Sequence, residues 1–184
     1  MTGLVAQGIV PEGCTVSPAP ALAPPKPGLC AEGALIAFAF GQMRAETLGD
    51  LARLGLTLRL TPWRMILLAG AASLPDLPGL VIRADDPLLR VTACAGAPDC
   101  MQALGATRQL ARSLAALVPE DRHLHVSGCS KGCAHPAAAD LTLVATAAGY
   151  DLVRAGSASD AAALTGLRPP QIARHLKDTD AASL

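Results

Sequence analysis

The sequence predicts an α+β protein made of two units that follow a proline-rich tail. The chain of 184 residues is 51% hydrophobic, which is enough to bury a sizeable core. Short apolar runs of strand length alternate with apolar residues at helical spacing. The stretch ASLPDLPG breaks these patterns with two prolines and a glycine, and so marks a boundary. We therefore expect a tail over 1–33, a first unit over 34–74 and a second unit over 80–184.

The tail is defined by the run VSPAPALAPPKPG. Proline lacks an amide hydrogen, so it neither donates to a strand ladder nor continues a helix. This composition is typical of a tail or linker rather than of a folded element.

The first unit is expected to contain one helix and three strands. The apolar run ALIAFAF (34–40) has strand length, and LTLRL (56–60) and RMILLA (64–69) predict two further strands around a turn at Thr61-Pro62. Between them, RAETLGDLARL (44–54) predicts a helix. Its apolar residues recur at helical spacing: Ala45, Leu48, Leu51, Ala52 and Leu54.

The second unit is expected to begin with a helix over 102–117, directly after Cys100. A strand over 123–127 then enters the tight loop GCSKGCAHP. Two apolar runs, 140–146 and 150–154, predict a hairpin. A short helix over 169–178 follows, with proline tolerated in its first turn.

The overall charge and composition exclude several function classes. Fifteen basic residues balance fifteen acidic ones, and aromatic residues make up 2% of the chain, so nucleic-acid binding is not expected. The apolar start, Met1 to Val10, lacks a basic region, and the longest apolar stretch is interrupted by Pro75, Asp76 and Pro78. We expect a cytoplasmic protein that does not bind membranes.

Four of the six cysteines form two close pairs. Cys94 and Cys100 flank five residues, and Cys129 and Cys133 flank three. Four thiolates are the usual ligands of a [4Fe–4S] cluster, whereas structural zinc favours shorter gaps between paired cysteines. Spacing alone leaves a cluster, a zinc ion and inert buried thiols open.

Glycines accompany both cysteine pairs. Gly96 lies within the first pair, and Gly128 and Gly132 lie beside or within the second. Glycine adopts positive φ without strain, so the backbone can close around a bulky anion and direct amide groups at sulfur. Cys14 and Cys30 flank the proline-rich stretch and are predicted to be free thiols without a role in the site.

The runs TACAGAPDCMQALGATRQLARSLA and LHVSGCSKGCAHPAAADLTLV carry a resemblance. They are similar to the cluster-binding signature of the siroheme sulfite and nitrite reductase superfamily. SGCSKGCAHP and YDLVRAGSASD most closely resemble the precorrin-3B synthase family. LIAFAFGQMRAETLGDLARLGLTLRLTPWRMILLAG resembles the ferredoxin-like half domain that precedes the cluster domain in these proteins. The resemblance covers residues 34–160.

The resemblance implies a fold, a cofactor and a reaction. The fold is a ferredoxin-like half domain followed by a nitrite/sulfite reductase-type [4Fe–4S] domain, with the cluster on Cys94, Cys100, Cys129 and Cys133. The reaction is the dioxygen-dependent hydroxylation of precorrin-3A at C20 with γ-lactone formation, in aerobic cobalamin biosynthesis. It needs a reductant, and a separate non-haem iron is thought to take part. In the reductases the last cysteine also bridges the cluster to siroheme, a role that falls on Cys133.

Members of this family contain two copies of the half-domain-plus-domain unit, and this sequence resembles the second copy. We therefore expect a second half, either a separate chain or a second copy of this one, to complete the substrate site. Two alternatives stay open: a siroheme-dependent sulfite or nitrite reductase fragment, and a non-catalytic electron-transfer subunit that only carries the cluster.

Several other side chains are candidates for binding the substrate. Arg59, Arg64 and Lys131 are candidate partners for the carboxylates of a tetrapyrrole, because a guanidinium binds a carboxylate with two hydrogen bonds. Arg90 is a further donor. An alternative for each is a purely solvated side chain.

The histidines and the single tryptophan favour structural roles. His123, His125 and His135 could ligate iron, but no carboxylate lies at ligand spacing, so packing is the preferred interpretation. Trp63 is likewise expected to pack rather than to form a stacking platform.

Overall fold

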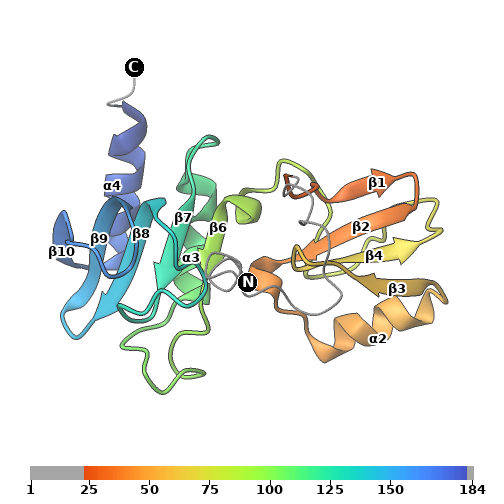
Figure 1. Ribbon diagram of the computed structural model, residues 1–184, viewed down its shortest axis with the longest axis horizontal. Helices are drawn as coiled ribbons and strands as arrows, with labels where there is room; N and C mark the ends of the chain where they lie inside the picture. Colours follow the sequence, from red (N-terminus) through yellow and green to blue (C-terminus); the bar gives the residue numbers. More distant parts are fainter. Residues whose placement is uncertain (1–22, 182–184) are drawn as a thin grey trace, which may run out of the picture.

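The computed structural model describes residues 23–181 and confirms the predicted α+β class. Two five-stranded sheets lie next to each other along the long axis of the molecule (Figure 1). The first sheet uses strands β1 to β5 and the second uses β6 to β10. No helix in this part of the chain has the length and apolar character needed to cross a membrane.

The first sheet is antiparallel, with strand order β1-β2-β4-β3 and with β5 paired to the far end of β2. Helix α2 (Ala45–Arg53) covers one of its faces (Figure 1). Leu51 of this helix is fully buried against the sheet residues Ile36 and Leu68. The strands are β1 (Gly28–Cys30), β2 (Gly33–Phe38), β3 (Thr57–Leu60), β4 (Met65–Ala69) and β5 (Leu80–Val81).

Two sequence-based expectations for this unit need correction. Strand β1 pairs with β2 although it falls within the stretch predicted to be a tail, because the prolines end just before it. In α2 the buried residues are Thr47 and Leu51, four positions apart, whereas Leu48 and Leu54 are exposed. Thr47 can face the sheet because its hydroxyl donates to the Pro78 carbonyl.

The second sheet is mixed, with strand order β10-β9-β8-β7-β6. The strands β6, β7 and β8 are parallel, and β8, β9 and β10 are antiparallel. The β8–β9 hairpin confirms the predicted one. The strands are β6 (Val91–Ala93), β7 (Leu124–Ser127), β8 (Ala139–Thr146), β9 (Gly149–Gly156) and β10 (Leu164–Leu167).

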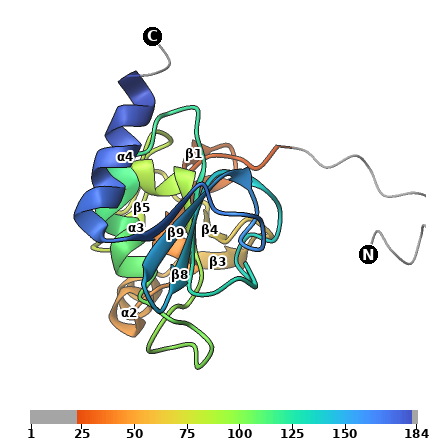
Figure 2. The ribbon, with the colours of Figure 1, turned by 90° about the vertical axis from the view of Figure 1, so that its left-hand side faces the viewer.

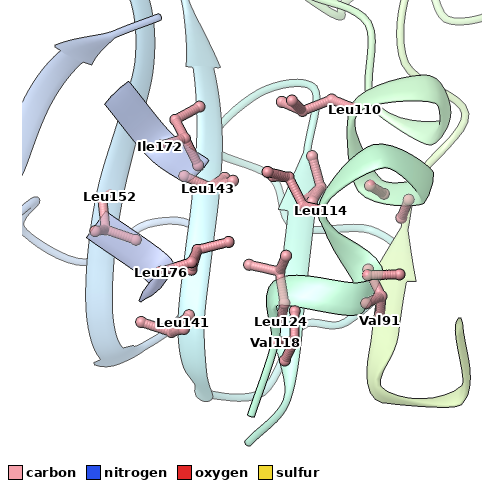
Figure 3. Packing of buried hydrophobic residues seen from close by; sticks show 14 of the residues in the cluster. Val91, Leu110, Leu114, Val118, Leu124, Leu141, Leu143, Leu152, Ile172 and Leu176 are labelled. Atoms are coloured by element: carbon pink, nitrogen blue, oxygen red, sulfur yellow. The ribbon is translucent and has the colours of Figure 1, made fainter. Parts of the chain in front are cut away.

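Helices α3 (Arg108–Leu114) and α4 (Pro169–Ala181) cover one face of this sheet, on the same side of β8 and β9 (Figure 2). A short 3-10 turn, Ala115–Leu117, extends α3. Leu114 of α3 and Leu176 of α4 pack against Leu124 and Leu143 of the strands (Figure 3). Each leucine side chain buried here stabilises the fold by about 2 kcal/mol. Since this cluster has more buried residues than any other in the described part of the chain, it is the main core.

The helix predicted over 102–117 begins only at Arg108. The backbone before it is used elsewhere, because Leu104 donates its N–H to the Gly128 carbonyl at 2.8 Å and Gly105 accepts from Ala97 at 3.0 Å. Leu104, expected on the buried helix face, is 62% exposed.

The opposite face of the second sheet carries buried polar side chains. His125, Ser127 and Thr142 are fully buried there, at strand positions that alternate with the core leucines. The connection between β7 and β8, residues 128–138, must run back along the strands because the two strands are parallel. Gly132 and His135 of this connection lie next to His125.

Candidate functional site

The topology of the second sheet brings together the loops that begin with Cys94 and Cys129. Cys94 directly follows β6, and Cys129 follows β7 by two residues. Because β6 and β7 are parallel neighbours, their carboxyl ends meet at one edge of the sheet. Cys94 donates its N–H to the Val126 carbonyl at 3.3 Å, and the Gly128 N–H lies 3.1 Å from the Cys94 Sγ atom.

Two glycines allow this close approach. Gly96 has φ +69°, and a Cβ atom there would lie 2.4 Å from the Thr107 hydroxyl oxygen. The first cysteine loop is the segment 94–107 between β6 and α3, and the second is the segment 128–138 between β7 and β8. A Cβ atom at Gly128 would lie 2.7 Å from the Cβ of Ala103 in the first cysteine loop. A side chain at Gly128 would push the two loops apart, and one at Gly96 would displace Thr107.

The four cysteines provide donors that suit a [4Fe–4S] cluster. All four are free thiols; Cys94, Cys100 and Cys129 are half-buried and Cys133 is exposed. They lie on two adjoining loops, and one sulfur already accepts a backbone amide, the kind of hydrogen bond that tunes a cluster.

The described residues contain no group of three His, Cys, Asp or Glu side chains arranged to hold a single metal ion. Tetrahedral zinc draws its sulfur ligands to about 2.3 Å from one point, whereas a cube spreads them over its corners. The ligands are therefore assigned from the spacing of the cysteines and the meeting of their loops, not from a preformed group of sulfurs.

The three histidines pack together beneath the second cysteine loop. The ring centroids of His123 and His135 are 4.7 Å apart, those of His125 and His135 are 5.7 Å apart, and both pairs meet edge to face. Burial lowers the pKa of His125 to about 4 and also lowers the pKa of His123. Neither ring nitrogen of His125 has a hydrogen-bond partner among the described residues. In this structure the three rings pack against one another.

A cleft of about 550 Å³ lies between the two sheets. Its walls include Phe40, Trp63 and Arg64 from the first unit and Arg90 and Thr92 from the second. Trp63 is 41% exposed on this wall, so it does not pack into a core as predicted. The exposed part of an aromatic side chain at a cleft can contact a ligand.

Arg64 connects the cleft to the second cysteine loop. Its guanidinium donates to the carbonyl of Ala134, the residue after Cys133, at 3.3 Å. Its backbone has φ +58°, and the stem of its side chain packs over Gly41, where a Cβ atom would lie 3.3 Å from the Arg64 Cδ. The structure thus directs this arginine toward the second cysteine loop.

The other cationic candidates differ in whether they line the cleft. Arg90 lines the cleft and donates to the Val118 carbonyl at 2.9 Å, while its Nε has no partner. Arg59 lies exposed on edge strand β3, and Lys131 is exposed between Cys129 and Cys133; neither lines the cleft. Cys30 is an exposed free thiol, and Cys14 lies outside the described residues.

Sequence reasoning missed two residues at this site. The hydroxyl of Thr107 donates to the Cys94 carbonyl and that of Ser127 donates to the Cys129 carbonyl. Ser127 stands two residues before a cysteine, a position from which a hydroxyl can reach the backbone locally, so its role had a visible signal. Thr107 stands thirteen residues after Cys94, and no local pattern links the two.

Known proteins match this chain in sequence and in fold. No family model matches it. Half of the chain, 95 residues, is 39% identical to precorrin-3B synthase of Sinorhizobium sp.. The predicted resemblance is confirmed. The matched part is 21% of the length of that enzyme, so the match spans about a fifth of it.

The fold has a relative among solved structures. The NirA protein of Mycobacterium tuberculosis superposes with a TM-score of 0.56 at 20% identity, over 88% of this chain and 38% of that protein. At this identity the likeness concerns the fold alone. It supports the predicted nitrite reductase-type α+β fold.

Proposed function

We propose that this chain holds a [4Fe–4S] cluster on Cys94, Cys100, Cys129 and Cys133 and serves a tetrapyrrole-modifying oxidoreductase. The observation that carries the proposal is the meeting of the two cysteine loops at one sheet edge, with the Gly128 amide on the Cys94 sulfur. The sequence match to precorrin-3B synthase supports the choice of substrate class.

The proposal divides the chain into the parts predicted from the sequence. The first sheet with α2 is the ferredoxin-like half domain, and the second sheet is the cluster domain. When bound, the cluster would supply single electrons to the reaction. The chain's own residues would hold it, screen it on one side and direct backbone amides at its sulfur ligands.

The cleft between the sheets is proposed to bind one side of the substrate. Arg64 and Arg90 would bind carboxylates of precorrin-3A, since guanidinium groups form paired hydrogen bonds to them. Trp63 and Phe40 would contact the apolar ring system. The whole reaction would be the hydroxylation at C20 with lactone formation, using dioxygen and a reductant, with a non-haem iron as a possible further cofactor.

A second half is part of the proposal. Lys26, Arg64 and Arg90 are the cations among the residues that line the cleft, and Asp85, Asp86 and Glu120 line it as well. A substrate with many carboxylates needs more positive charge than this, because a buried unpaired carboxylate costs several kcal/mol. A separate chain or a second copy of this one would supply the remaining cations.

The first test is metal content. Protein purified without oxygen should contain about four iron atoms and four acid-labile sulfides per chain and be brown. Replacing Cys129 by serine should remove most of the iron, whereas replacing Cys30 should not. Stoichiometric zinc without labile sulfide would refute the cluster.

The second test is turnover. The isolated chain should bind its cluster but consume precorrin-3A only when the N-terminal half of a full-length relative is added, under air with reductant. Equal turnover with and without the added half would show that no second half is needed. A loaded chain that remains inactive in both assays would favour a non-catalytic electron carrier.

One observation favours siroheme as a second candidate. Cys133 is exposed, whereas the other three cysteines are half-buried, so its sulfur is accessible to a further group. Reconstitution with siroheme distinguishes the reductase from the synthase. A Soret band that disappears in Cys133→Ser favours the reductase, and a cluster spectrum without a Soret band favours the synthase.

A further inference from the structure

Each cysteine pair begins with a cysteine whose backbone carbonyl is held by a buried hydroxyl. The Thr107 Oγ1 donates to the Cys94 carbonyl at 2.6 Å, and the Ser127 Oγ donates to the Cys129 carbonyl at 2.7 Å. Thr107 is 1% exposed and Ser127 is fully buried. Neither cysteine carbonyl takes part in the β6–β7 ladder, so the hydroxyls provide bonds that the sheet does not.

The two hydroxyls act on the two partners of one hydrogen bond. Gly128, whose N–H lies 3.1 Å from the Cys94 sulfur, stands between Ser127 and Cys129. The Ser127 bond closes a turn around this glycine and so fixes the direction of its amide. The Thr107 bond fixes the backbone of Cys94, which carries the accepting sulfur.

We propose that Thr107 and Ser127 are positioning residues that set the reduction potential of the cluster by holding the Gly128 amide on the Cys94 sulfur. The proposal rests on the proposed cluster and adds two residues to its ligand loops. A hydrogen bond to a ligand sulfur stabilises the reduced cluster, which carries one more negative charge, and therefore raises the potential. Loosening either hydroxyl clamp should lower it.

The structure offers a matched control. Thr142 is fully buried in strand β8, and its hydroxyl donates to the Gly156 carbonyl at 2.7 Å. This bond has the same chemistry and burial as the Thr107 bond but touches neither cysteine loop. Thr107→Val and Thr142→Val each remove a buried hydroxyl that donates to a backbone carbonyl, so the general cost of losing such a bond is present in both.

The experiment compares Thr107→Val, Ser127→Ala, Thr107→Ser and Thr142→Val after anaerobic reconstitution. The midpoint potential is measured by reductive titration with dithionite and mediator dyes, followed by visible absorption. We expect more negative potentials in Thr107→Val and Ser127→Ala, and wild-type potentials in Thr142→Val and Thr107→Ser. A potential in Thr107→Val equal to that of Thr142→Val would overturn the proposal, as would equal shifts in Thr107→Ser and Thr107→Val.

Failure to load the cluster is also informative. If Thr107→Val takes up no cluster but its apoprotein unfolds in urea like that of Thr142→Val, the positioning role is supported, because the hydroxyl is then needed for the cluster to bind at all. If its apoprotein is unfolded while that of Thr142→Val is folded, the role is general stability and the proposal is overturned. A wild-type chain that takes up no cluster would instead refute the proposed function.

Discussion

Replacing Gly96 by alanine should open the first cysteine loop and lower the free energy of unfolding. The loss has two contributions, backbone strain and a broken hydrogen bond. At φ +69° a side chain costs about 1–2 kcal/mol in backbone strain alone. The new Cβ would also lie 2.4 Å from the Thr107 hydroxyl oxygen and 2.8 Å from the Thr107 backbone nitrogen. Displacing Thr107 breaks its bond to the Cys94 carbonyl, for about 1–3 kcal/mol more.

Gly55 provides the matched control for this substitution. It has φ +68° at the end of α2, and a Cβ there would meet nothing within 4 Å. Gly55→Ala should therefore show only the backbone strain of about 1–2 kcal/mol.

The measurement is urea unfolding of the two apoproteins together with the iron content after reconstitution. We expect Gly96→Ala to lose about 2–5 kcal/mol of unfolding free energy and most of its iron. Gly55→Ala should keep its iron. Equal destabilisation of the two variants, or full iron in Gly96→Ala, would refute the reasoning that the loop is closed by this contact.

Three further predictions concern the rest of the molecule. Because burial and then the neighbouring histidines lower the pKa of His125 to about 4, below its ordinary 6.5, the apoprotein should be fully stable above pH 6.5 and lose up to about 3 kcal/mol as the pH falls toward 4. His125→Leu should flatten that pH dependence of urea unfolding, and an unchanged slope would contradict the assignment. Leu143→Ala should cost about 2–5 kcal/mol because this core side chain is fully buried, whereas Leu60→Ala, at 87% exposure, should change stability by less than about 0.5 kcal/mol; thermal unfolding of the two apoproteins tests the contrast. Replacing Cys14 and Cys30 by serine should leave the visible spectrum of the reconstituted protein unchanged, and any loss of absorbance would show that the ligand set is misassigned.

The strands of the two sheets were predictable where apolar residues stand in runs or alternate. RMILLA and DLTLVAT form β4 and β8 as expected, because their side chains are buried on at least one face. The ends of the helices were less predictable. The start of α3 moved to Arg108 because backbone groups before it bond to the second cysteine loop, a tertiary contact that no helical pattern contains.

The cysteine pairs of the candidate site could be picked out from the sequence, whereas the residues that support their loops could not. Paired cysteines with adjacent glycines are a local signal, and the structure places the two loops side by side as that signal requires. The contact between Arg64 and Ala134 joins residues seventy positions apart, and the exposure of Trp63 depends on how the two sheets meet. Neither follows from spacing along one chain.

The parallel pairing of β6 and β7 has a consequence for how the site is made during biosynthesis. The first cysteine pair leaves the ribosome well before β7 does, and on its own it has no neighbouring loop to face. Parallel strands pair only after the long connection between them has closed, and here that connection contains α3. The two cysteine loops therefore meet late in folding. If the chain holds the proposed cluster, iron and sulfide would be delivered after the second sheet has folded, to a folded and empty protein.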